Sequence, residues 1–172
     1  MIRKTSLFLF GLLFSAISLY SQADSTKYGH MNLGNLLDEL PETAKAEATL
    51  RVFADSLNQK DSVLTMAFQE AYLQLKKEYD EGGLTQVQVQ ERQLALEKQR
   101  QDIQKYEEEA QALLDTKRQE LLAPILKRID DAIKAVAKDN GLLMIFDVSS
   151  GSMLFAAETI DVTSLVKTKL GI

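Results

Sequence analysis

The chain has 172 residues, a formal net charge of −5, one histidine and no cysteine. Without cysteine there is neither a disulfide nor thiol chemistry, so core packing, helix pairing or association must hold the fold together. The acidic balance argues against nucleic acid or an anionic lipid surface as the main partner.

The first 23 residues are typical of a secretory signal peptide. Arg3 and Lys4 precede an uncharged apolar stretch of fourteen residues, 7–20. A membrane-spanning helix needs roughly twenty such residues, so the alternative of an N-terminal anchor is disfavoured. Small side chains at Ser21 and Ala23 predict cleavage after Ala23. We therefore expect an exported, soluble mature chain.

Residues 24–40 are expected to form the first part of a small β body. The stretch YGHMNL (28–33) reads as a weak strand, because its alternation is partial and Gly29 interrupts it. One short helical turn follows. A long helix is predicted to begin near Pro41, since proline lacks only an N–H that the first turn of a helix does not use.

Residues 41–123 are predicted to form a long antiparallel helical hairpin, or arm. Gly82-Gly83 marks its tip, and Thr85 with Gln88 matches a capping box that opens the second helix. The first apolar stripe recurs at helical intervals and comprises Leu50, Phe53, Leu57, Leu64, Phe68, Ala71, Leu75 and Tyr79. The second has a seven-residue repeat typical of a coiled coil: Val89, Leu96, Ile103 and Ala110, flanked by Leu94, Tyr106 and Leu113.

Residues 124–172 are expected to complete the body. Pro124 predicts a bend near the base of the second helix, and Asn140-Gly141 predicts its end. Two strands joined by a tight turn are predicted at LLMIFDV (142–148) and MLFAA (153–157). Asp161 or Thr163 should cap a closing helix that runs through Leu170. The expected fold class is α+β, predominantly α, with the arm projecting from the β body.

No residue pattern supports catalysis or a cofactor. His30 is the only histidine, so no second imidazole or thiol can complete a metal site or a nucleophilic pair with it. Gly29 and Gly34 have the spacing of a phosphate loop, but Asn35 stands where that loop requires lysine. The carboxylates of 107–109 point in three directions on a helix. We predict that the protein is not an enzyme and uses neither ATP nor any other cofactor.

Four segments resemble the Skp/OmpH family of periplasmic chaperones: KYGHMNLGNLLDELPE, QELLAPILKRIDDAIKAVAKDNG, LLMIFDVSSGSMLFA and DVTSLV. They cover about residues 27–172 in the family's order. The resemblance implies a homotrimer in the periplasm with a shared, β-barrel-like core. Its arms would surround a cavity that holds unfolded outer-membrane β-barrel proteins without ATP.

The resemblance and the residues together suggest two sets of candidate site residues. Apolar groups near the tip are candidates for client binding, although they could instead only zip the tip of the hairpin: Phe68, Tyr72, Leu75, Tyr79, Leu84 and Val87. Apolar groups of the body are candidates for the oligomer core, because open strand edges invite pairing with another chain: Met31, Leu33, Leu143, Ile145, Phe146, Leu154 and Phe155.

The arm departs from the family's best-known members, whose arm tips are basic. Residues 60–81 contain three basic side chains and five acidic ones. Like charge repels a phosphate-rich surface, so we do not expect lipopolysaccharide or anionic lipid binding. An exported coiled-coil spacer or scaffold of the cell envelope remains an alternative function. A spacer would pair all of its apolar groups within the coiled coil, whereas a chaperone would leave some free.

Overall fold

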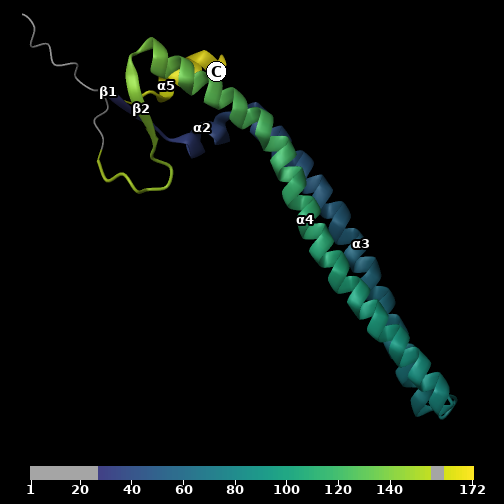
Figure 1. Cartoon of the computed structure of the whole chain (residues 1–172). Coiled ribbons are helices and arrows are strands. Elements are labelled where there is room, and N and C mark those ends of the chain that lie inside the picture. The colour runs from purple at the N-terminus through teal and green to yellow at the C-terminus, as the bar shows by residue number, and fades with distance from the viewer. Residues whose placement is uncertain (1–26, 156–160) are drawn as a thin grey trace, which may run out of the picture.

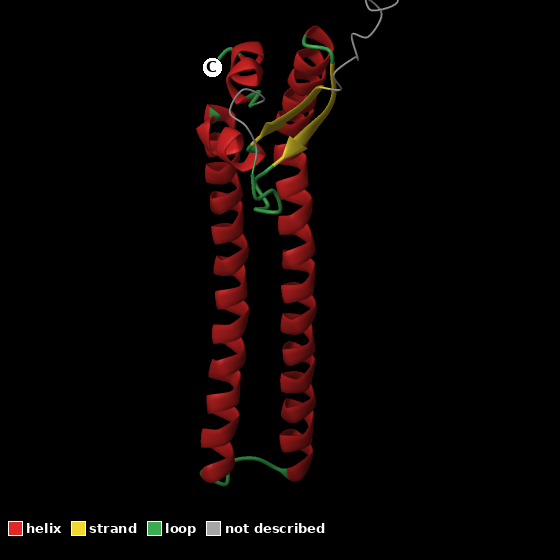
Figure 2. Ribbon diagram, turned by 90° about the vertical axis from the view of Figure 1, so that its left-hand side faces the viewer, coloured by secondary structure: helices red, strands yellow, loops and turns green. Residues whose placement is uncertain are grey.

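The computed structural model describes residues 27–155 and 161–172. The expected signal peptide and its cleavage site at Ala23 lie outside these residues. The described chain is elongated, with a small body at one end from which two long helices extend side by side (Figure 1, Figure 2). Within those residues, no helix is both long enough and apolar enough to cross a membrane.

The arm consists of α3 (Pro41–Asp80) and the first part of α4 (Gln86–Asp139). Pro41 occupies the first turn of α3, as predicted. The predicted capping box is also confirmed: the Thr85 side chain accepts from the Gln88 backbone, while the Gln88 side chain accepts from the Thr85 backbone. Gly82 has φ +69° and makes the turn between them. The forty residues of α3 span about 60 Å at 1.5 Å per residue.

Pro124 does not end α4, which runs on to Asp139. The helix curves where it leaves the arm and enters the body (Figure 1). That curvature is consistent with the bend predicted at Pro124, whose ring removes one backbone hydrogen bond. The helix stops at Asn140, and Gly141 adopts φ +62° after it, as the sequence predicted.

The body joins the two ends of the chain. Strand β1 (Lys27–Met31) pairs in parallel with β2 (Leu142–Asp147), and α2 (Leu33–Glu39) and α5 (Thr163–Leu170) lie beside them. The Asp147 carboxylate accepts from the backbone N–H of Leu33 at 3.1 Å and of Ser149 at 2.9 Å. Burial alone would raise the pKa of Asp147, but these bonds, with one from the Ser149 hydroxyl, hold it below its usual value.

One apolar core holds the body together. It draws side chains from β1, α2, the last third of α4, and α5, so segments from both ends of the chain are needed to close it. Burying each large aliphatic side chain stabilises the fold by about 1.5–3 kcal/mol relative to exposure. The core residues are Met31, Leu36, Leu40, Ile129, Ala132, Val136, Val162, Val166 and Leu170.

The second strand predicted at 153–157 is wrong for the residues that the structure describes. Residues 153–155 form no strand, and Ala156 and Ala157 lie outside the described range. The strand β2 pairs instead with β1, in parallel, and not with a neighbouring strand across a tight turn. Val162 is the N-cap of α5 and has no capping side chain, although the Asp161 carboxylate accepts from the Thr163 N–H at 2.8 Å.

Candidate functional site

A narrow apolar seam joins the two helices of the arm. Tyr106 is its best-buried aromatic residue, with 8% of its surface exposed. Its hydroxyl donates to the Leu57 carbonyl at 3.0 Å, and the Lys60 ammonium lies 4.5 Å from the ring centroid. Most other predicted stripe residues are only half-buried. The seam therefore pairs the helices but encloses little core.

A groove of about 410 Å³, the tip groove, lies between α3 and α4 near the end of the arm. Tyr72 and Tyr79 are 53% and 59% exposed on one wall, and three glutamines occupy the other. Apolar surface comes from Leu75 and Val89 deeper in the seam. Its lining residues are Tyr72, Leu75, Lys76, Tyr79, Gln86, Val89, Gln90 and Gln93.

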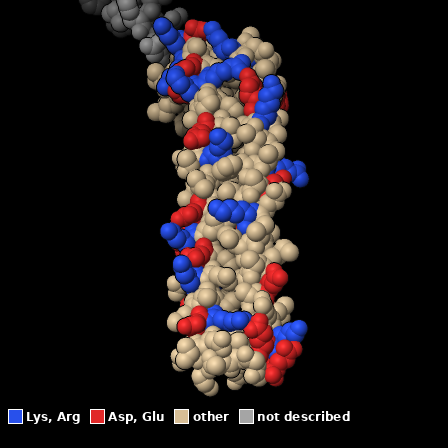
Figure 3. All heavy atoms as spheres, turned by 90° about the vertical axis from the view of Figure 1, so that its right-hand side faces the viewer, with Lys and Arg blue, Asp and Glu red and all other residues tan. Residues whose placement is uncertain are grey.

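The lining of the tip groove contains one charged residue, Lys76. An ion pair of 2.9 Å joins Glu78 of α3 to Arg92 of α4, and Gln74 also donates to the Glu78 carboxylate. The bonds from Arg92 and Gln74 hold the pKa of Glu78 below its usual value. Residues 82–90 carry no charge. In Figure 3 both signs of charge intermingle along the arm, and at its end uncharged atoms lie beside a cluster of acidic side chains.

A smaller cavity of about 220 Å³ lies halfway along the arm beside Tyr106. Ala54 and Ala110 line it, and their short side chains leave the space open. Asp61 also lines it, and its Oδ1 atom is buried without a hydrogen-bond partner in the described structure. The seam is therefore interrupted at this level by a polar gap.

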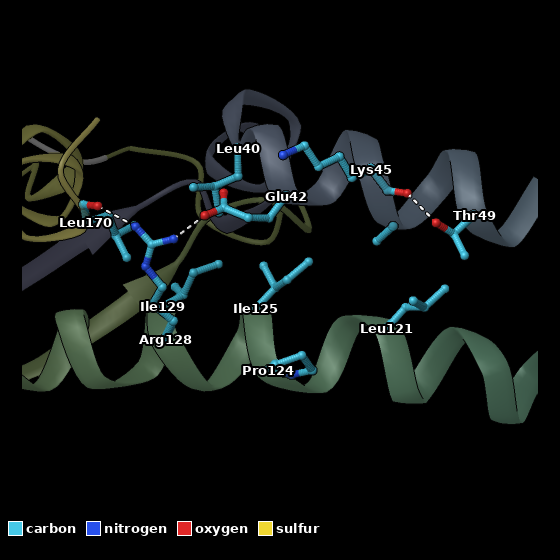
Figure 4. A pocket seen from close by; sticks show the side chains of 11 residues that line it. Leu40, Glu42, Lys45, Thr49, Leu121, Pro124, Ile125, Arg128, Ile129 and Leu170 are labelled. Atoms are coloured by element: carbon cyan, nitrogen blue, oxygen red, sulfur yellow. Dashed lines mark hydrogen bonds and ion pairs between the residues drawn. The ribbon is translucent and has the colours of Figure 1, made fainter.

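A third groove, the base groove, lies where α3, α4 and α5 meet and has a volume of about 440 Å³ (Figure 4). Its floor is apolar and includes Pro124 and Ile125. The Arg128 guanidinium donates to the Glu42 carboxylate and to the Leu170 carbonyl. The backbone N–H of Glu42 and the bond from Arg128 both hold the pKa of Glu42 below its usual value. Arg128 thereby fastens the root of the arm to the end of α5.

The six predicted client-binding residues do not form one surface. Tyr72, Leu75 and Tyr79 meet in the tip groove, although Leu75 is only 8% exposed. Val87 is 62% exposed but lies outside the groove, and Leu84 is half-buried. Phe68 is half-buried and likewise outside the groove. Tyr79, predicted as a stripe residue, is largely exposed.

A set of exposed apolar side chains on α3 was not predicted from the sequence. Val52, Val63, Met66 and Leu73 are each 63–70% exposed, and we call them the outer stripe. Residues 52, 66 and 73 follow a seven-residue spacing that is out of phase with the seam, and this second repeat was a readable signal. Leu94 of α4, predicted to flank the seam, is 72% exposed. The arm thus carries apolar surface that its own pairing does not use.

The predicted oligomer-core residues divide into two groups. Met31 is 2% exposed and belongs to the protomer's own core, against which Leu33 and Ile145 also pack. These three side chains therefore contribute to the protomer's own core. The other four are exposed, to 69%, 43%, 99% and 86% respectively: Leu143, Phe146, Leu154 and Phe155. Tyr28 and Met144 are exposed as well, and we call these six uncovered apolar side chains of the body the body face.

Comparison with known proteins agrees with this architecture. A crystal structure from Caulobacter crescentus CB15, described as a candidate outer membrane chaperone (OmpH-like), superposes with a TM-score of 0.67. The alignment covers 83% of this chain and 82% of that chain at 13% identity, so it establishes a shared fold. No curated protein matches the chain. The sequence model of the family described as "Outer membrane protein (OmpH-like)" matches residues 27–170. The chain therefore belongs to the OmpH-like family.

Proposed function

We propose that this protein is an ATP-independent holdase chaperone of the periplasm that binds unfolded outer-membrane β-barrel proteins between its arms and prevents their aggregation. The observation that carries the proposal is the apolar surface that the arm leaves unpaired. The outer stripe and Leu94 are each more than 60% exposed on helices that are already joined through a separate seam. Membership of the OmpH-like family supports the proposal.

The same observation disfavours a spacer or scaffold. A spacer gains nothing from Met66 or Leu73 in water, because exposed apolar groups promote adhesion and aggregation. Scattered apolar contacts on long arms instead suit an unfolded chain, which many weak contacts can hold together. This mode of binding needs no catalytic residue, nucleotide or cofactor. The acidic arm gives no reason to propose lipopolysaccharide or anionic lipid as a ligand.

We further propose that the protein assembles as a homotrimer through the body face. The sheet of the protomer has two strands in the described residues, and a parallel bridge between His30 and Asp161 already occupies part of the outer edge of β1. The outer edge of β2 can pair with another chain. Leu154 and Phe155, at 99% and 86% exposure, lie on a segment that follows β2. A cyclic assembly would cover these side chains and pair the open edge of β2.

Sedimentation velocity on the mature chain that begins at Asp24 tests the proposal. A urea-unfolded outer-membrane β-barrel protein is diluted into it. We expect an elongated trimer that gains the mass of one client and keeps it soluble. An elongated oligomer beside which the client aggregates would support the scaffold instead. A monomer would refute the proposed assembly.

A variant pair tests the assembly surface. Leu154→Ser with Phe155→Ser is expected to shift the oligomer to the monomer, because both side chains belong to the body face. The matched control is Val87→Ser with Leu94→Ser, which removes exposed apolar groups of the arm and should leave the oligomer intact. A trimer that survives the first pair of substitutions would show that the body face is not the interface.

A further inference from the structure

We infer that the tip groove binds the extended backbone of an unfolded polypeptide through the side-chain amides of Gln86, Gln90 and Gln93, opposite Tyr72 and Tyr79. The inference rests on the proposed chaperone function and specifies where a client is held and by what chemistry. It assigns the recognition to hydrogen bonds with the client's main chain, which every client presents regardless of sequence.

The two walls of the tip groove match in length. Gln86, Gln90 and Gln93 stand at i, i+4 and i+7 on α4, so they share one face of the helix. Tyr72 and Tyr79 are also seven residues apart, on α3. Seven residues of α-helix span about 10.5 Å, and an extended chain covers that length with about three residues. The groove is therefore long enough to contact a short extended segment on both sides.

The glutamines of the groove are free to bind a partner. None of the three amides makes a hydrogen bond within the described residues, whereas Gln74, Gln88 and Gln101 are each bonded to a neighbour in the arm. A primary amide offers both donors and an acceptor, which is the complement of a peptide group in either chain direction. Tyrosine adds apolar ring surface at low conformational cost, together with a hydroxyl.

The charge of the site favours a neutral occupant. Lys76 is the one charged residue in the lining. The nearby Glu78 carboxylate is paired with Arg92 at 2.9 Å, so it adds little net field. A single cation is a weak attractor for a polyanion, but it does not disfavour a peptide backbone. An oligosaccharide also presents neutral hydrogen-bonding groups. The apolar floor at Leu75 and Val89 and the link to chaperone function favour polypeptide, and the experiment separates the two.

The test compares two triple variants. The groove triple combines Gln86→Ala, Gln90→Ala and Gln93→Ala, and the control triple combines Gln59→Ala, Gln69→Ala and Gln104→Ala. The control glutamines are exposed and have no bonding partner in the described structure, but they line none of the three grooves. Alanine has the higher helix propensity, so neither triple should lose helix, and circular dichroism checks this. The probe is a fluorescein-labelled peptide of alternating valine and threonine with terminal lysines. Its analogue carries N-methyl groups on alternate backbone amides.

We expect the groove triple to bind the peptide roughly tenfold more weakly or worse, and the control triple to bind like wild type. The N-methylated analogue should lose affinity for the wild type to a similar degree. Equal binding by the two triples, or of the two peptides, would overturn the inference. If a soluble chitin oligosaccharide displaced the peptide at the concentration at which the peptide itself binds, the inference would be overturned in favour of a glycan site.

The outcome is distinguishable from a failure of the proposed function. If wild type and the groove triple both keep a β-barrel protein soluble and bind the peptide equally, the chaperone stands and the inference fails. If wild type does not keep the client soluble, the chaperone proposal itself fails. If the groove triple alone loses both peptide affinity and protection of the client, both stand.

Discussion

The hydroxyl of Tyr106 offers a sensitive measure of how the arm is held together. Tyr106→Phe deletes its bond to the Leu57 carbonyl and keeps the ring beneath Lys60. That carbonyl also lies within α3, where the helix supplies its own N–H partner, so no buried acceptor is orphaned. We therefore expect Tyr106→Phe to lower the free energy of unfolding by about 0.5–1 kcal/mol, the low end of the range for one hydrogen bond. Tyr106→Ala should lower the free energy of unfolding by about 3–5 kcal/mol, because the lost ring leaves a cavity that joins the space already beside it.

Hydrogen exchange of backbone amides measures these losses locally. In the regime where exchange follows the opening equilibrium, Tyr106→Phe should raise exchange rates in the middle of α3 and α4 about two- to fivefold. Tyr106→Ala should raise them more than about a hundredfold, while amides of the body core hold their wild-type rates. Tyr72→Phe is the control, because its hydroxyl makes no bond within the described chain. Unchanged exchange in Tyr106→Ala, or an equal loss in the body, would refute this account of the seam.

Three further predictions concern the turn, the tip and the root of the arm. Gly82→Ala should destabilise the arm by about 1 kcal/mol, because residue 82 has φ +69°. Gly83→Ala should destabilise it less, because residue 83 has no positive φ. Thermal unfolding of the two variants measures the difference. The pKa of Glu78 lies below its ordinary 4.5 through its bonds to Arg92 and Gln74, so its stabilisation of the tip is present above pH 4.5 and lost as pH falls through the lowered value. Glu78→Gln should remove this pH dependence from the protection factors of the amides at the tip, that is, from exchange rates corrected for the intrinsic effect of pH. A pH dependence that persists in the variant would implicate another group. Arg128→Ala should speed exchange in α5 several-fold by removing the bond to the Leu170 carbonyl, while Lys127→Ala, an exposed neighbour, should not.

Local signals predicted the arm well. Pro41, Gly82, the Thr85–Gln88 box and Gly141 each act within one helical turn, so the sequence alone placed the ends of both helices. The helical spacing of the first stripe also located the seam correctly at Leu75, and Tyr106, which was predicted to flank the second stripe, is buried there as well. The sequence did not predict which apolar residues of the arm are buried between the two helices. Tyr79 was placed in the first stripe and Leu94 beside the second, but the helices leave both exposed.

Long-range pairing explains the errors in the body. The segment at 142–148 was correctly predicted as a strand, but its partner is β1, more than a hundred residues away along the chain. Sequence periodicity carries no information about such a distant partner. The strand was therefore predicted to pair with the next apolar segment along the chain, across a tight turn. Met31 was assigned to an oligomer core for the same reason. An apolar strand residue has the same pattern whether its own protomer or a neighbour buries it.

The parallel pairing of β1 with β2 also sets an order of events during folding. Contacts between α3 and α4 near the tip join segments that are close in sequence, and such local contacts form quickly. The contact of Leu33 with Asp147 spans 114 residues and waits for nearly the whole chain. A chain truncated before residue 142 would therefore form the arm without a complete body. Its exposed apolar stripes would be present before the body that gathers them, which makes quality control of incomplete chains more demanding here than for a compact protein.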